Sequence, residues 1–491
     1  MRHGDFKARE RGGSVFETGI RQFRMAMSMV WGKPIDPRNV ERLVADALKT
    51  LEEFGAPGDD VQQLLEGPFA DPAARREFQV HVLQRTARHL MRSSPFYRTL
   101  FSSQNIDPDK LTLEDMHLIP TTSKRDLQER QQEFISTKAQ PYLVTRTTGT
   151  TGCPTEVWLS RYEIELWPAL AALSGLLRNE IGPTDCMQIN ISSRATAAVQ
   201  QNMTVCRLAK ARALVLGVIP PDESLDHLLA GGDDAPTLLA TYPSYLAQLV
   251  KAARRRGLDS GHFRLRRIDC GGEVLSAALV SATYDTLGPT LVNDTFGMTE
   301  VLPVSARVCN QGHLHHDLNI GYVEVIDLET GKPAAAGELG TVVITPYYPY
   351  RECMPVFRYD TRDIVRRLPD EPLTCDLSAV PATSRILGKA GHLWQVNGRV
   401  VTLRDLVEVY EALPSEPWPA RFRAEVCHDH IEMVVAEEAL HGITRAEIEQ
   451  RFQEKGLDVQ VVGSVTCTQD VSQLRPLRAD LLETTFSARR D

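Results

Sequence analysis

The chain has 491 residues, of which 42% are hydrophobic and 24% charged, a balance typical of globular proteins. This length exceeds what one hydrophobic core supports, so we expect roughly two to four domains. The net charge of −9 argues against a broad nucleic-acid-binding surface and against attraction to an acidic membrane surface.

The cysteines and the N-terminal segment bear on the compartment. The nine cysteines are scattered, odd in number and without a repeated spacing, which indicates reduced thiols rather than a disulfide framework. The apolar run at residues 25–31 is too short for a signal core or a membrane span. We therefore expect a cytoplasmic protein with no nucleic-acid partner and no membrane partner.

Helices are predicted in the N-terminal part. Asp36 followed by Pro37 is a typical helix start, and apolar residues then recur at helical spacing up to the Gly- and Pro-containing residues 55–58. A further helix is expected over about residues 72–91. Residues 1–80 are therefore interpreted as an N-terminal helical extension.

The central part alternates between strand and helix patterns. Short β-rich runs at residues 213–219 and 238–242 flank the helical pattern at residues 244–256, as in a layered α/β domain with parallel strands. Residues 321–327 and 340–345 are predicted as strands around a turn at residues 330–332. The large core domain, residues 81–387, is thus expected to be α/β with a β subdomain.

The last hundred residues have patterns of their own. Residues 423–426 and 431–436 are predicted as a hairpin across His428, Asp429 and His430. Thr444 and Glu447 form a capping box for a helix, and residues 459–465 form a final strand. The predicted fold class is α/β, with a large N-terminal layered domain and a small C-terminal α+β lid domain over residues 388–491.

A Gly- and Thr-rich run at residues 144–155, VTRTTGTTGCPT, carries the first chemical signal. Glycines let backbone N–H groups approach a polyphosphate closely, while Thr hydroxyls donate to the same oxygens. That chemistry suits ATP. If this run is considered by itself, the alternative is an ordinary surface loop. The candidate phosphate-binding residues are Thr147, Thr148, Gly149, Thr150, Thr151 and Gly152.

Further segments follow in a fixed order: NDTFGMTE at residues 293–300, FRYDTRD at 357–363, and Gly388-Lys389. Together they resemble the core motifs of the adenylate-forming enzymes, most closely the phenylacetate–CoA ligase branch. That branch has similar segments to PFYR at 95–98, LIPTTSKRDL at 118–127, YPSY at 242–245, GGE at 271–273 and GELG at 337–340. Ordered matches from about residue 80 onward are more specific than any single motif.

The resemblance implies roles for individual residues. Residues 147–152 would hold the β- and γ-phosphates of ATP, Glu300 would hold Mg²⁺, and Asp363 would accept the ribose hydroxyls. Carboxylates suit both tasks, because they are hard oxygen ligands and strong hydrogen-bond acceptors. The alternatives are a solvated carboxylate after a turn for Glu300, and an ion pair with Arg358 or Arg362 for Asp363.

Other positions complete the expected site. By resemblance, the further residues that bind the cofactor are Gly271, Gly272, Glu273, Asp294, Thr295 and Lys389. The residues that line the pocket for the acid are Tyr242, Phe296 and Gly297. The alternatives are a simple strand-to-helix turn for residues 271–273 and a core position for Phe296.

The sequence also departs from the family pattern. Cys153 replaces the Lys of the family's phosphate loop. The Lys that the family has near the C-terminus is also absent, and Arg475 is the cation nearest to its position. By resemblance, the catalytic residues are then Thr299, Glu300 and Arg475. Lys389 stands where the family usually has Arg, which keeps the charge but loses the planar fork. Gly391 and His392 replace the acidic hinge pair, so the lid is expected to turn about a flexible backbone. From these departures we expect adenylation to be slow, altered or lost.

A possible zinc site is the last chemical signal. Cys309-x5-His315 precedes Cys375, and some members of this branch carry a structural zinc built from Cys and His in these regions. Zinc prefers four ligands, and the fourth would be His313, His316, Cys353 or none. A metal-free site is the alternative.

The leading functional hypothesis is an enzyme that uses ATP and Mg²⁺ to activate a small aromatic carboxylic acid as its adenylate and passes the acyl group to CoA. One alternative is an adenylating enzyme that serves a carrier protein or an amine in a biosynthetic pathway. A third is a catalytically impaired, ligand-binding relative. The identity of the acid and the oligomeric state are left open, a homodimer being one option.

Overall fold

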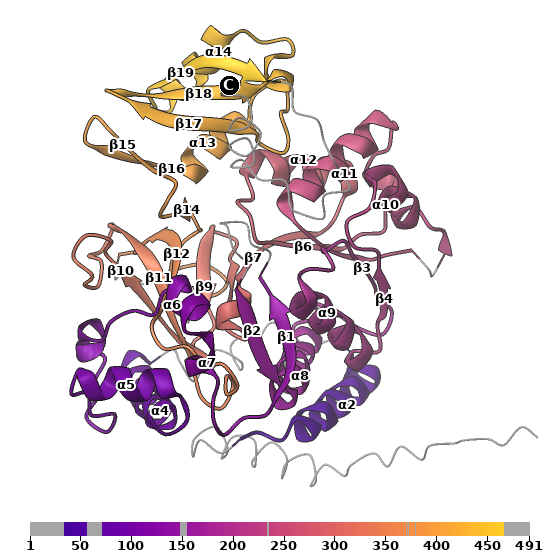
Figure 1. Ribbon diagram of the computed structural model, residues 1–491. Coiled ribbons are helices and arrows are strands. Elements are labelled where there is room, and N and C mark those ends of the chain that lie inside the picture. The colour runs from indigo at the N-terminus through magenta and orange to yellow at the C-terminus, as the bar shows by residue number, and fades with distance from the viewer. Residues whose placement is uncertain are drawn as a thin grey trace, which may run out of the picture.

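The computed structural model describes residues 34–55, 71–147, 155–232, 235–369, 371, 373–378 and 380–465. In Figure 1 the N-terminal and central residues form one large part, and the C-terminal residues form a smaller part on top of it. Predicted residues 148–152, together with Cys153 and Arg475, lie outside the described residues.

The N-terminal helices begin where the sequence predicts. α2 (Pro37–Phe54) is capped by the Asp36 side chain and ends at Gly55, and α4 (Pro72–Ser93) is capped in the same way by Asp71. An acidic cap followed by Pro fixes the first turn of each helix. Next come α5 (Pro95–Ser103), η2 (Glu114–Leu118), α6 (Lys124–Glu129) and α7 (Gln131–Phe134). Among the described helices, none has both the length and the apolar character needed to cross a membrane.

An eight-stranded sheet forms the centre of the large part, in the order β13-β9-β8-β7-β6-β5-β3-β4. The strands from β4 to β7 are parallel, and β8, β9 and β13 continue the sheet in antiparallel pairing. Their bounds are β3 (Cys186–Ile189), β4 (Arg212–Val215), β5 (Leu238–Thr241), β6 (Arg267–Gly271), β7 (Leu291–Gly297), β8 (Ser305–Val308), β9 (His313–His316) and β13 (Ala382–Ser384).

Helices connect the parallel strands, which confirms the predicted α/β layering. They are α9 (Thr196–Leu208), α10 (Pro221–Leu228), α11 (Pro243–Arg255), η4 (Ser260–His262) and α12 (Ala277–Leu287), while α8 (Arg161–Leu177) precedes the first parallel strand, β3. The short helix η5 (Thr299–Val301) follows β7.

Two smaller sheets complete the large part. The predicted β subdomain is the antiparallel sheet β10 (Gly321–Ile326), β11 (Leu339–Pro346), β12 (Tyr359–Arg366) and β14 (Gly388–Lys389). Pairing of β12 with β14 sets Asp363 opposite Lys389. β1 (Pro141–Arg146) pairs with β2 (Glu156–Ser160) on either side of the Gly- and Thr-rich run.

The C-terminal part is the predicted α+β unit. It begins with β15 (Leu393–Val396), β16 (Arg399–Thr402) and α13 (Leu403–Tyr410). β17 (Phe422–Cys427), β18 (His430–Ala436) and β19 (Val459–Val465) form one sheet, with η6 (Glu437–Leu440) and α14 (Arg445–Glu454) between the last two strands. The capping box between Thr444 and Glu447 is present, as expected.

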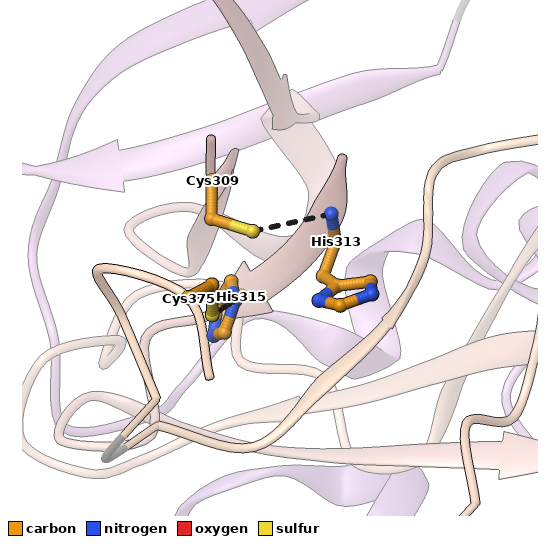
Figure 2. A group of neighbouring side chains, drawn as sticks. All are labelled: Cys309, His313, His315 and Cys375. Carbon is orange, nitrogen blue, oxygen red and sulfur yellow. Dashed lines mark hydrogen bonds between the residues drawn. The ribbon is translucent and has the colours of Figure 1, made fainter. Parts of the chain in front are cut away.

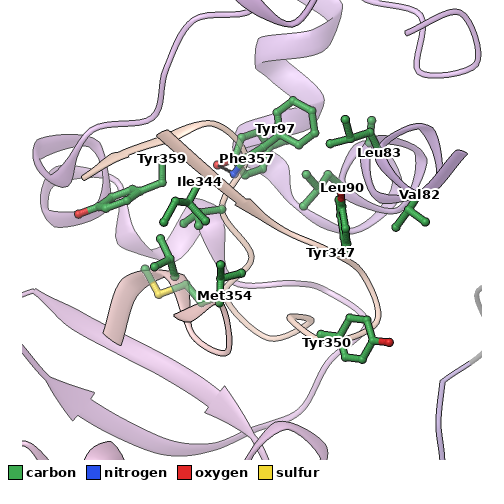
Figure 3. Packing of buried hydrophobic residues seen from close by; sticks show 14 of the residues in the cluster. Val82, Leu83, Leu90, Tyr97, Ile344, Tyr347, Tyr350, Met354, Phe357 and Tyr359 are labelled. Atoms are coloured by element: carbon green, nitrogen blue, oxygen red, sulfur yellow. Dashed lines mark hydrogen bonds between the residues drawn. The ribbon is translucent and has the colours of Figure 1, made fainter. Parts of the chain in front are cut away.

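The largest hydrophobic core joins the N-terminal helices to the β subdomain (Figure 3). Leu83 and Leu90 of α4 belong to the same cluster as Ile344 of β11 and the fully buried Phe357. The Tyr97 hydroxyl, also fully buried, accepts a hydrogen bond from the Phe357 amide at 2.7 Å. Because α4 crosses the expected boundary after residue 80, this packing anchors the end of the N-terminal extension on the large domain.

Candidate active site

A cleft with a cavity of about 880 Å³ lies between the ends of β5, β6 and β7, the strands β12 and β14, and helix α13 of the C-terminal part. Ligands of parallel α/β sheets commonly bind beyond the carboxyl ends of the strands. The predicted residues that line the cleft are Thr147, Tyr242, Gly271, Gly272, Glu273, Asp294, Thr295, Phe296, Gly297, Thr299, Glu300, Asp363 and Lys389.

Glu300 is a buried carboxylate that lines this cleft. It lies on η5 directly after β7 and is 3% exposed. Burial raises the pKa of Glu300, the positive charges of Lys124 and Lys389 lower it, and the neighbouring Asp363 raises it again. The alternative of a solvated carboxylate is therefore wrong, and a cation bound here would stabilise the charged form.

Asp363 is held by a lysine. Its Oδ2 lies 2.8 Å from Nζ of Lys389, which also donates to the Thr361 carbonyl at 3.1 Å. The expected arginine partners are engaged elsewhere: Nε of Arg358 donates to Glu324 at 3.0 Å, and Arg362 lies 3.9 Å from Asp360. The ion pair of Asp363 with either arginine is thus not formed, and Lys389 orients this carboxylate instead.

The glycine segment passes close to other backbone at the edge of the cleft. A Cβ on Gly271 would lie 2.8 Å from Oγ1 and 2.9 Å from the carbonyl oxygen of Thr295, so only glycine fits there. Gly272 has φ of 84°, and a Cβ on it would lie 3.7 Å from the Tyr242 ring. Glu273 accepts a hydrogen bond from the Ser244 amide at 2.8 Å, near the start of α11. The segment is both a strand-to-helix turn and a wall of the cleft.

Asp294 links the two parts of the molecule. Its Oδ2 accepts a hydrogen bond from Arg385 at 2.8 Å and lies 3.9 Å from a guanidinium nitrogen of Arg404, on α13. Arg404 also donates to the Leu275 carbonyl of the large part at 2.9 Å. The structure therefore gives Asp294 an ion-pairing role in addition to its place in the cleft.

One region of the cleft is apolar. Phe296 is partly buried, and its ring meets that of His316 edge to face with centroids 6.3 Å apart. Burial lowers the pKa of His316 to about 4, so this imidazole is neutral near pH 7. The other apolar side chains that line the cleft include Ile191, Met298, Leu302, Val308 and Leu314.

Sequence reasoning did not single out several residues of the cleft. Lys124, the first residue of α6, lines the cleft and is among the cations that act on Glu300. It stands in the LIPTTSKRDL segment, whose resemblance to the family was the one available signal. Tyr359 and Thr361, which stand in the FRYDTRD segment, also line the cleft, as do Arg404 and Glu411, for which the sequence held no signal.

Away from the cleft, the structure gathers two cysteines and two histidines (Figure 2). Cys309 follows β8, His313 and His315 lie on β9, and Cys375 comes from a later loop. One ligand atom from each lies within 4.8 Å of the others. The predicted trio is thus brought together, and His313 is the fourth member.

Each imidazole of this cluster has a nitrogen suited to a metal. Nδ1 of His315 bonds to the Val380 carbonyl at 2.8 Å, which leaves Nε2, 3.3 Å from Sγ of Cys375. Nδ1 of His313 is buried without a hydrogen-bond partner among the described residues. The other candidates lie outside the group: His316 faces Thr383, and the Cys353 amide donates to Glu163. The donor set Cys₂His₂ is one that zinc prefers.

Comparison with known proteins defines the class. Residues 84–348 match the model of the AMP-binding enzyme family, so the chain belongs to the AMP-binding enzymes. The phenylacetate-coenzyme A ligase of Pseudomonas putida is 26% identical over 376 residues, covering 72% of this chain and 82% of the relative. The ligase of the same name from Escherichia coli (strain K12) is 28% identical over 334 residues, covering 65% and 72%.

A solved structure has the same fold. 2-Hydroxyisobutyryl-CoA ligase in the postadenylation state, in complex with R3-HIB-AMP, superposes with a TM-score of 0.68 at 20% identity and covers 85% of this chain and 92% of that chain. The same ligase in its thioesterification state, with 2-HIB-AMP and CoA, gives a TM-score of 0.56 over 85% and 93% of the two chains at 20% identity. Both structures share the fold of this chain.

Proposed function

We propose that this protein activates a small carboxylic acid with ATP and transfers the acyl group to CoA. The observation that carries the proposal is one cleft, in an AMP-binding enzyme, that holds both the buried Glu300 and the Asp363–Lys389 pair. The relatives named phenylacetate-coenzyme A ligase support the same reaction class.

The reaction has two balanced steps. A carboxylate oxygen of the acid attacks the α-phosphorus of ATP, the bond to the bridging oxygen breaks, and pyrophosphate leaves. The CoA sulfur then attacks the acyl carbonyl, AMP leaves with the bonding electrons, and the thiol proton passes to solvent. Both steps bring anions together, so they depend on fixed donors and cations.

The residues of the cleft divide these tasks. Asp363, fixed by Lys389, would accept hydrogen bonds from the ribose hydroxyls. Thr147 would stand at the base of the phosphate-binding run, where its Oγ1 accepts a hydrogen bond from the Thr155 amide at 2.9 Å. Lys124 would supply a cation that Cys153 does not.

Glu300 fits a magnesium ion. Its burial and raised pKa describe a carboxylate that needs a positive neighbour, and hard oxygen donors are the ligands Mg²⁺ prefers. When bound, Mg²⁺ would neutralise phosphate charge. Without Mg²⁺, the positive charges of Lys124 and Lys389 partly stabilise the ionised carboxylate of Glu300.

An aromatic acid fits the apolar region best. Tyr242 and Phe296 offer ring surfaces, and Ile191 and Leu314 extend the apolar lining. Phenylacetate and benzoate are therefore expected to be better substrates than acetate.

Paired carboxamide variants test the site. Glu300→Gln and Asp363→Asn keep side-chain size but remove charge, so each is expected to slow acid-dependent pyrophosphate release at least tenfold. Asp327→Asn, in an exposed turn, is the control and should leave the rate unchanged. Rates within twofold of the unaltered protein for both cleft variants would contradict the assignment.

We also propose that Cys309, His313, His315 and Cys375 hold a structural zinc ion. It would tie the β8–β9 turn to the loop that carries Cys375. There Cys309 and Cys375 form a small hydrophobic cluster with Leu373 and Leu377. A closed four-ligand site stabilises the fold outright.

Elemental analysis of the dialysed protein tests the zinc proposal. One tightly held equivalent is expected, lost in Cys375→Ser together with a lowered melting temperature. Cys206→Ser, at a buried thiol outside the cluster, is the control and should keep the zinc. Zinc well below one equivalent in the unaltered protein would contradict the site.

A further inference from the structure

A second group of metal-binding side chains lies on the hairpin of the C-terminal part. The segment Cys427-His428-Asp429-His430-Ile431-Glu432 contains a thiol, two imidazoles and two carboxylates within six residues. It spans the end of β17, the two-residue turn and the start of β18. This segment has no part in the function proposed above.

The hairpin register brings three of these side chains to one face. Cys427 pairs directly with His430 across the turn, and Glu432 is two residues further along β18. Residues that face each other across antiparallel strands share a face of the sheet, as do residues two apart. The opposite face carries Ile431 and Met433, which are fully buried. One ligand atom from each of Cys427, His430 and Glu432 lies within 4.8 Å of the others.

His430 is arranged as a metal ligand would be. Its Nδ1 lies 3.1 Å from Oδ1 of Asp429, and its Nε2 is buried without a hydrogen-bond partner among the described residues. A carboxylate that holds one ring nitrogen fixes the tautomer that leaves the other nitrogen free to bind a metal. A buried, unpaired nitrogen costs free energy, and a bound cation would remove this cost.

The donor types select the cation. A thiolate, an imidazole and a carboxylate are ligands of Zn²⁺ and similar transition metals, whereas Mg²⁺ and Ca²⁺ prefer oxygen alone. Tetrahedral zinc with bonds of about 2.0–2.3 Å sets its ligand atoms roughly 3.3–3.8 Å apart. Ligand atoms that start within 4.8 Å of one another therefore need to close by about 1.5 Å at most. Nδ1 of His428, 3.4 Å from Sγ of Cys427, is near enough to offer a fourth donor.

We propose that Cys427, His430 and Glu432 bind one transition-metal cation of the Zn²⁺ type at the β17–β18 turn. The site is separate from the Cys309 cluster, and its side chains are only partly buried, so its metal exchanges with solution. The proposal is independent of the reaction assigned to the cleft.

Cobalt titration of the full-length, reduced, zinc-loaded protein tests this site. The protein is first dialysed until only tightly held metal is left, and Co²⁺ is then added. The unaltered chain is expected to bind one further equivalent and to develop the near-ultraviolet absorption of a thiolate–Co²⁺ bond. The double variant Cys427→Ser with His430→Gln should lose that equivalent and that absorption.

A matched control separates the turn from ordinary surface histidines. His262 also has a carboxylate partner, since its Nδ1 lies 2.9 Å from Oδ1 of Asp259, but no cysteine belongs to that group. His262→Gln is expected to leave the cobalt equivalent intact. Cys427 and His430 are only partly buried, so the double variant is expected to fold. Melting temperatures equal to those of the unaltered chain, measured without added metal, verify this. Equal cobalt stoichiometry in the double variant and the unaltered chain, or no additional equivalent in either, would overturn the proposal.

Discussion

At the residue scale, we infer that Lys124 supplies the positive charge that the usual phosphate-loop lysine would bring to the cleft. The chain has Cys153 in that place, outside the described residues, while Lys124 contributes a positive charge beside Glu300. A cation near the leaving pyrophosphate stabilises charge that develops as the α-phosphate is attacked. We infer that the chain tolerates the loss of the phosphate-loop lysine because Lys124 already places a cation near Glu300.

We predict that Lys124→Ala slows pyrophosphate release about tenfold or more, because the loss of one charge–charge contact in a partly closed cleft is worth roughly 1.4–3 kcal/mol. Lys124→Arg should recover most of the rate. Arg125→Ala is the matched control, because Arg125 is the next residue in the chain and its exposed side chain pairs with Glu129. Single-turnover rates with saturating ATP measure all three. A rate for Lys124→Ala equal to that of Arg125→Ala would show that Lys124 has no role in the reaction.

At the element scale, the link between β14 and β15 forms a hydrogen-bonded turn. The His392 amide donates to the Lys389 carbonyl at 2.8 Å, so Gly391 takes the third position of a β-turn. The sequence suggested only a free hinge at Gly391. A proline at that position would disturb the turn itself, so the movement of the lid is better tested through the contacts that dock it.

Further docking contacts of the lid come from α11 and from Ser276, the residue before α12. Arg254 donates to Glu416 at 2.6 Å and stacks over the Trp418 ring, whose centroid is 5.3 Å away. Lys251 pairs with Glu438 at 3.1 Å, and Ser276 donates to Glu411. We expect adenylate to form while the lid is docked in this way, because Arg404 of the lid then lies 3.9 Å from Asp294 in the cleft.

We predict that Arg254→Ala slows adenylate formation about fivefold and leaves transfer from preformed adenylate to CoA within twofold. The ion pair and the cation–π contact together are worth about 1 kcal/mol at a partly exposed site. Arg255→Ala is the matched control, because Arg255 pairs with Asp222 inside the large part. Rapid-quench measurement of each half-reaction separates the effects. Equal slowing of both half-reactions would mean that docking does not distinguish them.

At the scale of the whole molecule, the interface between the two parts contains a titratable group. Glu411 is buried, and its two oxygens accept hydrogen bonds from Ser276 and from the Ala420 amide at 2.5 and 2.7 Å. Burial raises the pKa of Glu411 from 4.5 to about 7, an effect that these hydrogen bonds and Lys251 only partly offset and that Glu408 increases.

We predict that the free energy of unfolding falls between about pH 4.5 and pH 7 because of this group. The folded state binds the proton more tightly than the unfolded state, so the contribution of Glu411 is complete below its ordinary pKa and is lost as the pH rises through about 7. The difference between the two pKa values of Glu411 corresponds to about 3 kcal/mol at most in the free energy of unfolding. Glu411→Gln imitates the protonated form and should flatten this part of the profile.

Melting temperatures of the unaltered protein and of Glu411→Gln, measured from pH 5 to pH 8, check this prediction. Glu454→Gln, at the exposed end of α14, is the control and should keep the slope of the unaltered chain. Parallel profiles for Glu411→Gln and the unaltered protein would show that Glu411 is ionised throughout.

Local patterns predicted the elements well, while the chemistry of the cleft depended on the fold. Asp36 and Asp71 mark helix starts and the Thr444–Glu447 pair marks another, because caps act within one turn of the chain. The predicted cleft residues came from ordered motifs. The partner of Asp363 was missed because the register of β12 and β14, not their spacing in sequence, places Lys389 beside it.

The same limit applies to the metal cluster and to the interface. His313 was one of several candidates for the fourth ligand, since only the pairing of β8 with β9 and the return of the chain at Cys375 decide which side chains meet. Arg404 and Glu411 were not found because they reach the cleft from α13 and the residue after it, across the boundary between two parts of the molecule.

Acid-dependent release of pyrophosphate from ATP, measured with and without CoA over a panel of aryl and short acyl acids, tests the central claim most directly. We predict release that requires an acid, is faster with phenylacetate or benzoate than with acetate, and turns over repeatedly with formation of acyl-CoA and AMP only when CoA is present. Sustained release that CoA does not alter would contradict transfer to CoA and point to another acceptor. No acid-dependent release at all, from a chain that binds ATP, would contradict the proposed activity and identify a ligand-binding relative.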